Sequence, residues 1–265
     1  MDERIETSNL SAGYGNKPIV SDMDLCLEKG QVVCLIGANG SGKSTVLKTI
    51  TRQIKKVSGS ISIFGRDEEG LSDEDIAKHI SMVTTEHIHP ELMTCRDVVA
   101  TGRYPYTGRL GFLGKDDIEK IDEAINMLGI ENISGKYFSK VSDGQRQRVM
   151  LARAICQDTD ILILDEPTSF LDIEFKIDIL RVIRKLSQNG KSILMSIHEL
   201  ELVPAIGDKV LAIYDGKIYK AGSPSEILTG ENLEKMYEMK LGTGDVMAAG
   251  LWQYAASLKS IIWQK

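Results

Sequence analysis

The chain has 265 residues, 42% of them hydrophobic, which is ample for a core and fits one large α/β domain with a subdomain. Its formal net charge of −6 argues against nucleic-acid binding, which requires a basic surface. No apolar run approaches the roughly 20 residues needed to cross a bilayer. The charged start Met1–Glu6 lacks a signal-peptide core, and the four cysteines show no C-x-x-C spacing. We therefore expect a protein that stays in the reducing cytoplasm.

The first part of the chain is β-like. Four segments surround a glycine-rich loop, namely Ile5–Leu10, Asp22–Leu27, Gln31–Ile36 and Ser60–Phe64. We expect an antiparallel sheet here, beside the core of the domain. The apolar run just before the loop has the character of a buried strand.

That loop, Gly37–Thr45, has the pattern G-x-x-x-x-G-K-[ST]. It follows the apolar run Val32–Ile36 and opens the helix-compatible run Val46–Arg52, which is the context in which such loops bind phosphate at a helix N-terminus. Lys43 supplies a positive charge, and the Ser44 hydroxyl can join a Mg²⁺ shell. The candidate ATP-binding residues are Gly37, Asn39, Gly40, Ser41, Gly42, Lys43, Ser44 and Thr45. The pattern indicates a nucleoside triphosphate site.

Helical signals follow. Ser72–Asp75 is typical of a capped helix start. A helix is predicted over Asp116–Leu128, ending at Gly129. Its apolar stripe comprises Ile118, Ile121, Ile125 and Leu128.

A second apolar run, Asp160–Leu164, ends in two acids, Asp165 and Glu166. A buried parallel strand would deliver Asp165 to the edge of the sheet, where it can hold Mg²⁺ through water. Glu166 is then placed to orient or deprotonate an attacking water molecule. Paired with the phosphate loop, this element predicts hydrolysis. Further along, Ser192–Ile197 is a predicted strand and Asp215-Gly216 a hairpin turn.

The segment Val141–Arg148 reads V-S-D-G-Q-R-Q-R and precedes the helix-compatible run Val149–Ile155. With the two elements above, it resembles the nucleotide-binding subunits of ATP-binding cassette (ABC) transporters, whose signature is L-S-G-G-Q. The matching residues are Ser142, Gly144 and Gln145, and the departures are Val141 and Asp143. The resemblance implies that this helix N-terminus grips the γ-phosphate of ATP held by a second copy of the chain.

Asp143 has two interpretations. An acid at a helix N-terminus is locally favourable, which we prefer. Alternatively, its carboxylate weakens the grip on ATP.

The resemblance extends to about residues 3 to 240 and carries further residues with it. It places an adenine-stacking ring at Tyr14, an interface loop with a typical acid at Ser169–Asp172, and a γ-phosphate contact at His198. Asp172 and Tyr14 are therefore candidate nucleotide-site residues, and His198 joins Glu166 and Lys43 as candidate catalytic residues.

One family residue is absent, the glutamine that contacts Mg²⁺ in the loop between core and helical subdomain. Ungapped alignment puts Thr85 there, with Glu86 adjacent. We favour Glu86 as the substitute, since its oxygen has similar reach, which gives Ser44, Asp165 and Glu86 as the metal-site candidates. The alternative is that Glu86 is a solvated loop acid.

The resemblance implies a P-loop nucleotide-binding core, an antiparallel β subdomain and an inserted helical subdomain over about residues 87–158, within a cassette spanning 1–240. Residues 241–265 form a C-terminal extension, for which a helix packed on the core is preferred over a contact with a second copy or a membrane subunit. ATP and Mg²⁺ are the implied cofactors.

The stretch Val98–Gly108 resembles a segment found in importer ATPases for iron–siderophore complexes, haem and cobalamin. It lies in the helical region that members of this family turn toward the membrane subunits. Arg103, Tyr104 and Tyr106 are amphipathic anchors suited to an interface; local packing around Pro105 is the alternative.

The expected function is ATP hydrolysis that powers import of a metal chelate. Implied partners are a second copy, a polytopic membrane permease and a substrate-binding protein, which places the chain on the inner face of the cell membrane. The alternative is a soluble ABC ATPase in iron–sulfur cluster assembly or regulation.

Overall fold

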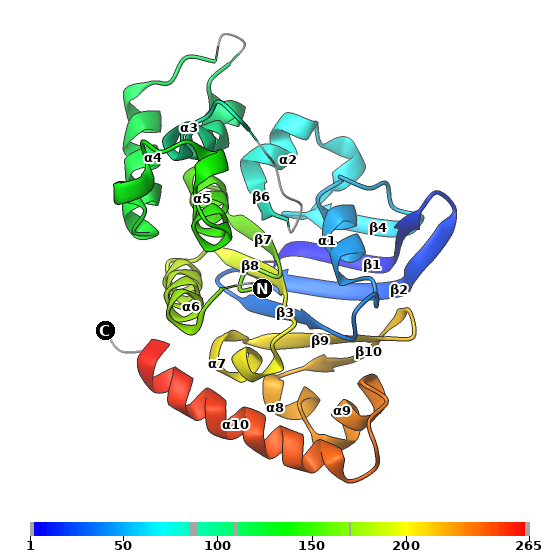
Figure 1. Ribbon diagram of the computed structural model, residues 1–265. Helices are drawn as coiled ribbons and strands as arrows, with labels where there is room; N and C mark the ends of the chain where they lie inside the picture. Colours follow the sequence, from blue (N-terminus) through cyan, green and yellow to red (C-terminus); the bar gives the residue numbers. More distant parts are fainter. Residues whose placement is uncertain (1–2, 85–89, 109–110, 170, 263–265) are drawn as a thin grey trace.

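The computed structural model describes residues 3–84, 90–108, 111–169 and 171–262. Its centre is a six-stranded sheet in the order β10-β9-β3-β8-β7-β6, parallel except for β10 (Figure 1). The strands are β3 (Val32–Ile36), β6 (Ile80–Val83), β7 (Ile161–Asp165), β8 (Ser192–Ser196), β9 (Lys209–Tyr214) and β10 (Lys217–Gly222). Every residue of β3, β7 and β8 is buried, as expected of parallel strands covered on both faces.

The second sheet is antiparallel, in the order β2-β1-β4-β5. Its strands are β1 (Glu3–Tyr14), β2 (Lys17–Glu28), β4 (Ser58–Ile63) and β5 (Arg66–Asp67). Three of the four predicted N-terminal strands form this sheet. The fourth, around Val32–Ile36, lies instead in the parallel sheet as β3, because it has no polar face to leave in water.

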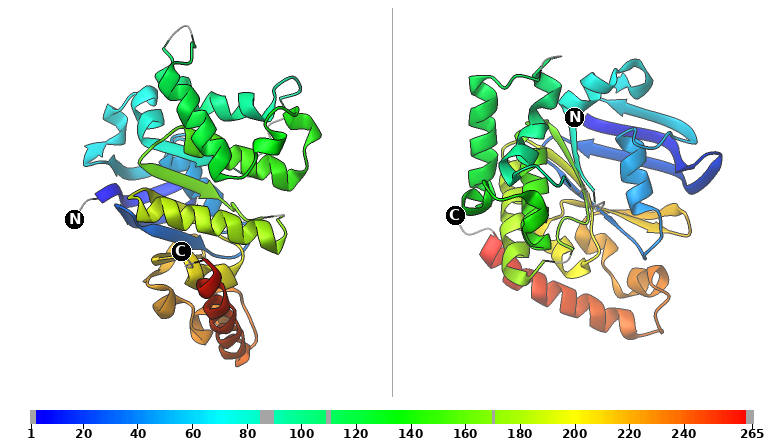
Figure 2. Two further views of the ribbon diagram at one scale, coloured as in Figure 1. Left: turned by 90° about the vertical axis from the view of Figure 1, so that its left-hand side faces the viewer. Right: turned by 45° about the horizontal axis from the view of Figure 1, so that its top comes forward.

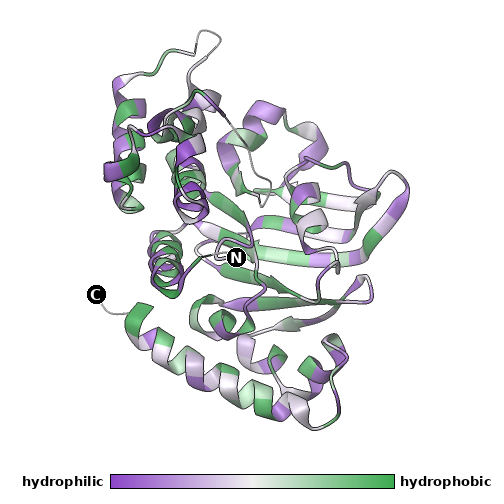
Figure 3. Cartoon of the chain, viewed as in Figure 1, coloured by the Kyte–Doolittle hydropathy of each residue, from purple (hydrophilic) through white to green (hydrophobic). Residues whose placement is uncertain are grey.

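Two hydrophobic layers cover the central sheet. Helix α1 (Lys43–Ile50) packs its Val46, Leu47 and Ile50 between the antiparallel sheet and one face of the central sheet. The opposite face packs against α5 (Asp143–Cys156), α6 (Ile173–Gln188) and α7 (Val203–Ile206). The central strands are accordingly the most continuously hydrophobic part of the fold in Figure 3.

Helices inserted between β6 and β7 stand together at one end of the molecule (green in Figures 1 and 2). They are α3 (Cys95–Ala100), η2 (Thr101–Tyr106), α4 (Lys115–Met127), η3 (Glu131–Ile133), η4 (Phe138–Lys140) and α5. The helix predicted over 116–128 is α4. Ile121, Ile125 and Leu128 are buried as expected, but Ile118 is 45% exposed, because only part of the stripe faces α3 and α5.

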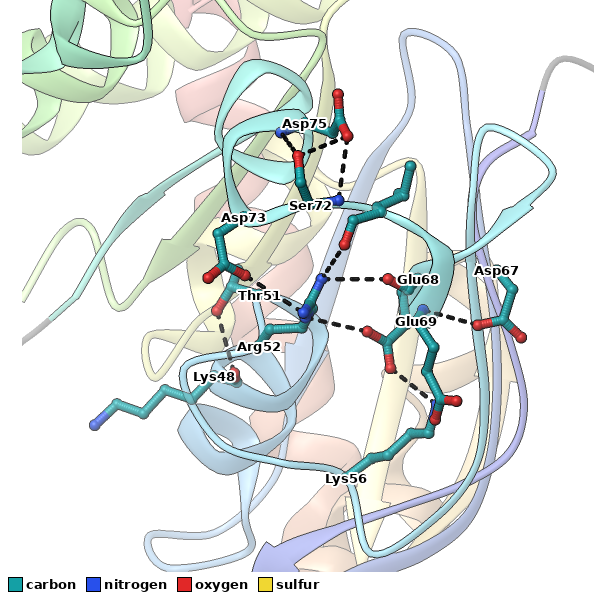
Figure 4. A network of polar contacts seen from close by, with 11 residues as sticks. Lys48, Thr51, Arg52, Lys56, Asp67, Glu68, Glu69, Ser72, Asp73 and Asp75 are labelled. Atoms are coloured by element: carbon teal, nitrogen blue, oxygen red, sulfur yellow. Dashed lines mark hydrogen bonds and ion pairs between the residues drawn. The ribbon is translucent and has the colours of Figure 1, made fainter. Parts of the chain in front are cut away.

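The region after β4 contains η1 (Glu68–Gly70) and α2 (Asp73–His79), whose predicted Ser72–Asp75 capping box is formed. Its buried Glu68 binds two cations that follow α1 (Figure 4): Glu68 Oε2 lies 3.3 Å from Arg52 Nε, and Glu68 Oε1 lies 2.8 Å from Lys56 Nζ. Arg52 Nη1 also donates to the Leu71 carbonyl at 2.8 Å. These bonds fix the C-terminal end of α1 to the antiparallel side of the protein.

After β10 the chain forms α8 (Pro224–Ile227), α9 (Gly230–Met236) and α10 (Thr243–Ile262). Helix α10 packs along α9, α7, η5 (Leu200–Leu202) and α6, on the side of the molecule away from the inserted helices (Figure 2). Within the described residues, the C-terminal extension is therefore the packed helix that the sequence predicted. None of the helices in the described ranges combines the length and apolar character needed to cross a membrane.

Candidate functional site

The loop between β3 and α1 has a backbone that only glycine tolerates. Gly37, Gly40 and Gly42 have φ of 153°, 78° and 99°. A Cβ on Gly37 would lie 2.5 Å from the Ile213 carbonyl oxygen, and one on Gly42 would lie 2.5 Å from a methyl group of Val20. Gly37 and Gly42 are thus favoured by backbone angle and by close packing, and Gly40 by backbone angle alone, and together they leave the N-terminus of α1 open.

Lys43 is the first residue of α1 and is only 5% exposed. Its Nζ donates to the carbonyl oxygens of Gly37 at 2.9 Å and Ala38 at 3.2 Å. Burial lowers the pKa of the ammonium group, while the charges of Glu166 and Asp165 act in the opposite direction. The ammonium group of Lys43 is therefore held by carbonyl groups of the phosphate loop. The carboxylates of Glu166 and Asp165 are close enough to act on its pKa.

Asp165 ends β7 and is completely buried. Its Oδ1 accepts hydrogen bonds from Ser44 Oγ at 3.0 Å and from Ser196 Oγ at 2.6 Å. Its Oδ2 is buried and has no hydrogen-bond partner among the residues that the structure describes. An unpaired buried carboxylate oxygen is costly, so this atom calls for a cation or water. The hydroxyl and carboxylate oxygens of Ser44 and Asp165 are ligands that suit Mg²⁺.

Glu166 follows Asp165 with a left-handed backbone, φ 47°. Its N–H donates to Ser196 Oγ at 2.8 Å, and its Oε2 accepts from Ser169 Oγ at 3.0 Å. It lines a cavity of about 270 Å³ together with Lys43 and Ser44. Glu166 thus faces the same cavity as Lys43 and Ser44, although more than 120 residues separate it from them in the chain.

A second cavity, of about 460 Å³, lies beside the loop and is lined by Ala38, Asn39, Gly40 and Ser41 together with residues 213–216 and 236–238. Ile19 lines both cavities. Sequence reasoning missed Ile19 and residues 236–238, because no motif contains them and only the tertiary fold brings them to the loop.

The signature segment begins α5. Ser142 caps the helix and forms a capping box with Gln145, with Gln145 N–H donating to Ser142 Oγ at 3.3 Å. A Cβ on Gly144 would lie 3.3 Å from a methyl group of Leu171, so the glycine fits closely there. Asp143 is exposed and pairs with Arg146 at 2.8 Å, the local arrangement expected of a helix N-terminal acid.

The described residues that line the two cavities include none from this helix. Gln147 Nε2 donates to the Pro167 carbonyl at 3.3 Å and so connects α5 to the segment after β7.

The remaining predicted residues that the structure describes line neither of these two cavities. Tyr14 ends β1 and is 56% exposed. His198 is exposed and follows β8 closely, and Asp172 caps α6 by accepting from the Phe175 N–H at 3.2 Å. Thr85 and Glu86 lie outside the described residues; the preceding strand β6 ends at Val83, paired with Leu164.

The predicted interface segment is only partly at the surface. Arg103 is 8% exposed: its Nε donates to Asp117 Oδ1 at 2.8 Å, its Nη1 donates to the Cys156 carbonyl at 2.9 Å, and its guanidinium stacks 4.1 Å from the Tyr106 ring. Arg103 is therefore not a free surface anchor; it serves the local packing that was the alternative. Tyr104, in contrast, is 63% exposed.

The family's sequence profile, described as "ABC transporter", matches residues 20–169. An uncharacterised ABC transporter ATP-binding protein of Methanocaldococcus jannaschii is 40% identical, over 89% of this chain and 82% of that protein. The petrobactin import ATP-binding protein YclP of Bacillus subtilis is 34% identical, over 89% and 94% of the two chains. The ferric enterobactin transport ATP-binding protein FepC of Escherichia coli is 30% identical, over 93% and 92%.

Among solved structures, a putative metal-chelate type ABC transporter in an inward-facing conformation has a TM-score of 0.78 and 26% identity, with 89% of each chain covered. The phosphate loop and the acidic end of β7 are features of an ATP-binding cassette, and the relatives agree with that class. The chain belongs to the ABC transporter family. The resemblance inferred from sequence, the fold class and the expectation of an ATPase are confirmed.

Proposed function

We propose that this chain is the ATP-hydrolysing subunit that powers import of a metal chelate of the siderophore class through a separate membrane permease. The observation that carries the hydrolytic part is the buried Asp165 Oδ2, which has no hydrogen-bond partner among the described residues, on the carboxylate that accepts from Ser44 and one residue before Glu166. The names of the petrobactin and enterobactin relatives support the cargo class and favour import over a role in iron–sulfur cluster assembly.

In this proposal the N–H groups of the phosphate loop and the N-terminus of α1 bind the β- and γ-phosphates. Lys43 exchanges its bonds to the Gly37 and Ala38 carbonyls for phosphate oxygens, because a triphosphate is the stronger partner for a desolvated ammonium. Ser44 and Asp165 would hold Mg²⁺, which would neutralise phosphate charge. Tyr14 stacks on adenine.

Glu166 accepts the proton of the attacking water, and the Ser169 hydroxyl orients its carboxylate. His198 contacts the γ-phosphate from the end of β8. Whether Glu86 or Thr85 adds an oxygen ligand to Mg²⁺ stays a prediction.

We infer that two copies form a head-to-tail pair in which Ser142, Gly144 and Gln145 complete the partner's site, with Asp172 at the interface. The N-terminus of the 14-residue helix α5 favours an anion, and its capping residues lie outside the cavities beside this chain's own phosphate loop. An isologous pair then contains two identical sites.

We propose that the permease docks in a groove of about 640 Å³ between the core and the inserted helices. Exposed Tyr104 and the segment Thr51–Gln53 after α1 line it, so it touches both the helical insertion over about residues 87–158 and the continuation of the phosphate-loop helix. The cassette spans 1–240, with 241–265 as an extension. The permease would hold the chain on the inner face of the membrane, and a substrate-binding protein would deliver the chelate.

The test is uptake of radiolabelled iron bound to a catecholate, a hydroxamate or a carboxylate siderophore, in cells lacking this gene. We expect loss of uptake of at least one chelate, with rescue by the wild-type chain and no rescue by Glu166→Gln. Normal uptake of all three, together with reduced activity of iron–sulfur enzymes, would instead support the soluble alternative.

A further inference from the structure

Strands β7 and β8 are parallel neighbours that end in register, with Asp165 opposite Ser196 (Figure 1). The two segments that follow them therefore leave the sheet at the same edge. Three residues beyond each strand end the two segments meet, because Thr168 Oγ1 donates to Glu199 Oε2 at 2.7 Å. Neither of these two residues lines the cavities beside the phosphate loop.

The Glu199 carboxylate has a second partner, on α6. Its Oε1 pairs with the ammonium group of Lys176, whose own N–H donates to the Asp172 carbonyl at 3.0 Å in the first turn of that helix. The carboxylate is only 21% exposed, and Thr168 is 2% exposed. One oxygen of Glu199 thus binds a cation on a packed helix while the other accepts from a buried hydroxyl, which fixes the direction of the side chain.

The turn that contains Thr168 also carries the proposed catalytic base. Ser169 Oγ donates to Glu166 Oε2 at 3.0 Å, and Ser169 N–H donates to the Glu166 carbonyl at 3.2 Å. Before the turn, the Glu166 N–H donates to Ser196 Oγ at 2.8 Å. The turn is therefore attached at both ends to one neighbouring segment, by Ser196 at the end of β8 and by Glu199 three residues later.

We propose that Glu199 is a positioning residue for hydrolysis: by holding Thr168, it fixes the turn in which Ser169 directs the Glu166 carboxylate toward the attacking water. This inference rests on the proposed ATPase function. A displacement of about 1 Å in a reacting group costs up to about 10²-fold in rate, so a partial loss of alignment should lower kcat by about 10-fold. Binding of ATP should not change, because neither Glu199 nor Thr168 lines the nucleotide cavities.

The experiment compares Glu199→Ala, which removes both bonds, with Thr168→Val, which removes only the hydroxyl. The matched control is Glu201→Ala, two residues further along the same segment in η5. Phosphate release with Mg-ATP gives kcat and KM, calorimetry in EDTA gives the Kd for ATP, and the melting temperature checks folding. Glu199→Gln, which keeps an acceptor for the Thr168 hydroxyl, tests rescue.

A readout that a merely structural role would not move comes from combining Glu199→Ala with Glu166→Gln. A positioning residue acts through the base, so it should matter little once the base is gone. The residual hydrolysis of the double variant is compared with that of Glu166→Gln alone in single-turnover experiments.

We expect Glu199→Ala and Thr168→Val each to lower kcat about 10-fold, with the Kd for ATP within about 2-fold of wild type. Glu201→Ala should match wild type, and Glu199→Gln should return kcat to within about 3-fold of it. In the Glu166→Gln protein, Glu199→Ala should cost less than about 2-fold.

The proposal is overturned by a kcat within about 2-fold of wild type in both variants, by a change confined to KM or Kd, or by an equal loss with and without Glu166. If Glu199→Ala fails to fold, Thr168→Val carries the test alone. A wild-type chain that hydrolyses no ATP, or a Glu166→Gln protein with the wild-type rate, would refute the proposed function instead, so the two failures are distinguishable.

Discussion

Replacing Glu166 with glutamine separates hydrolysis from binding. The substitution keeps the side-chain volume, and the amide oxygen can still accept from the Ser169 hydroxyl, which lies 3.0 Å from the carboxylate. What is lost is the basic group that faces the cavity with Lys43 and Ser44. Removal of a positioned general base costs about 10²- to 10⁴-fold in rate, equivalent to about 3–5 kcal/mol in the activation barrier.

Binding of ATP should be retained or slightly tightened, because one negative charge beside the triphosphate is removed while the loop and Lys43 stay in place. Phosphate release at saturating Mg-ATP measures the rate, and gel filtration with Mg-ATP measures the pairing that slow hydrolysis should trap. Glu174→Gln, on the exposed first turn of α6, is the control and should behave as wild type. Phosphate release from the Glu166→Gln protein within about 3-fold of wild type would refute the assignment of the base. A strict monomer at high protein and ATP concentration, with and without permease, would count against the paired sites.

Three further outcomes are expected. If Glu86 is the Mg²⁺-side contact, Glu86→Ala should impair permease-coupled ATPase activity and Glu86→Gln should retain much of it; a crippled Thr85→Ala with a normal Glu86→Ala would reverse that choice. Glu68→Ala should lower the free energy of unfolding in urea by about 1–3 kcal/mol, since it removes the buried carboxylate and leaves Arg52 and Lys56 only the exposed acidic partners Asp73 and Glu69. The exposed pair partner Asp73 is its control, and Asp73→Ala should cost less than about 1 kcal/mol. Asp143→Asn should change the ATPase rate by less than about 3-fold, as for a simple helix N-terminal acid; a tenfold gain would show that the carboxylate weakens the grip on ATP.

The class of protein was readable from short, contiguous patterns, because their chemistry is local. The glycines of residues 37–42 are demanded by backbone angles within one turn, and the apolar run before Asp165 predicts a buried strand that carries an acid to the sheet edge. The roles assigned to Tyr14, His198 and Asp172 remain predictions, since none of the three lines the cavities beside the phosphate loop.

Tertiary structure decided what depends on partners distant in the chain. The amphipathic pattern around Arg103 could not reveal that Asp117 and the Cys156 carbonyl bury its guanidinium, nor could the stripe on α4 reveal that Ile118 faces water. Tyr237 belongs to no motif, and it lines the cavity beside the phosphate loop only because α8 and α9 pack against β9. Local sequence thus determined the backbone geometry and chemistry of each segment, whereas burial and long-range contacts determined which side chains meet at the site.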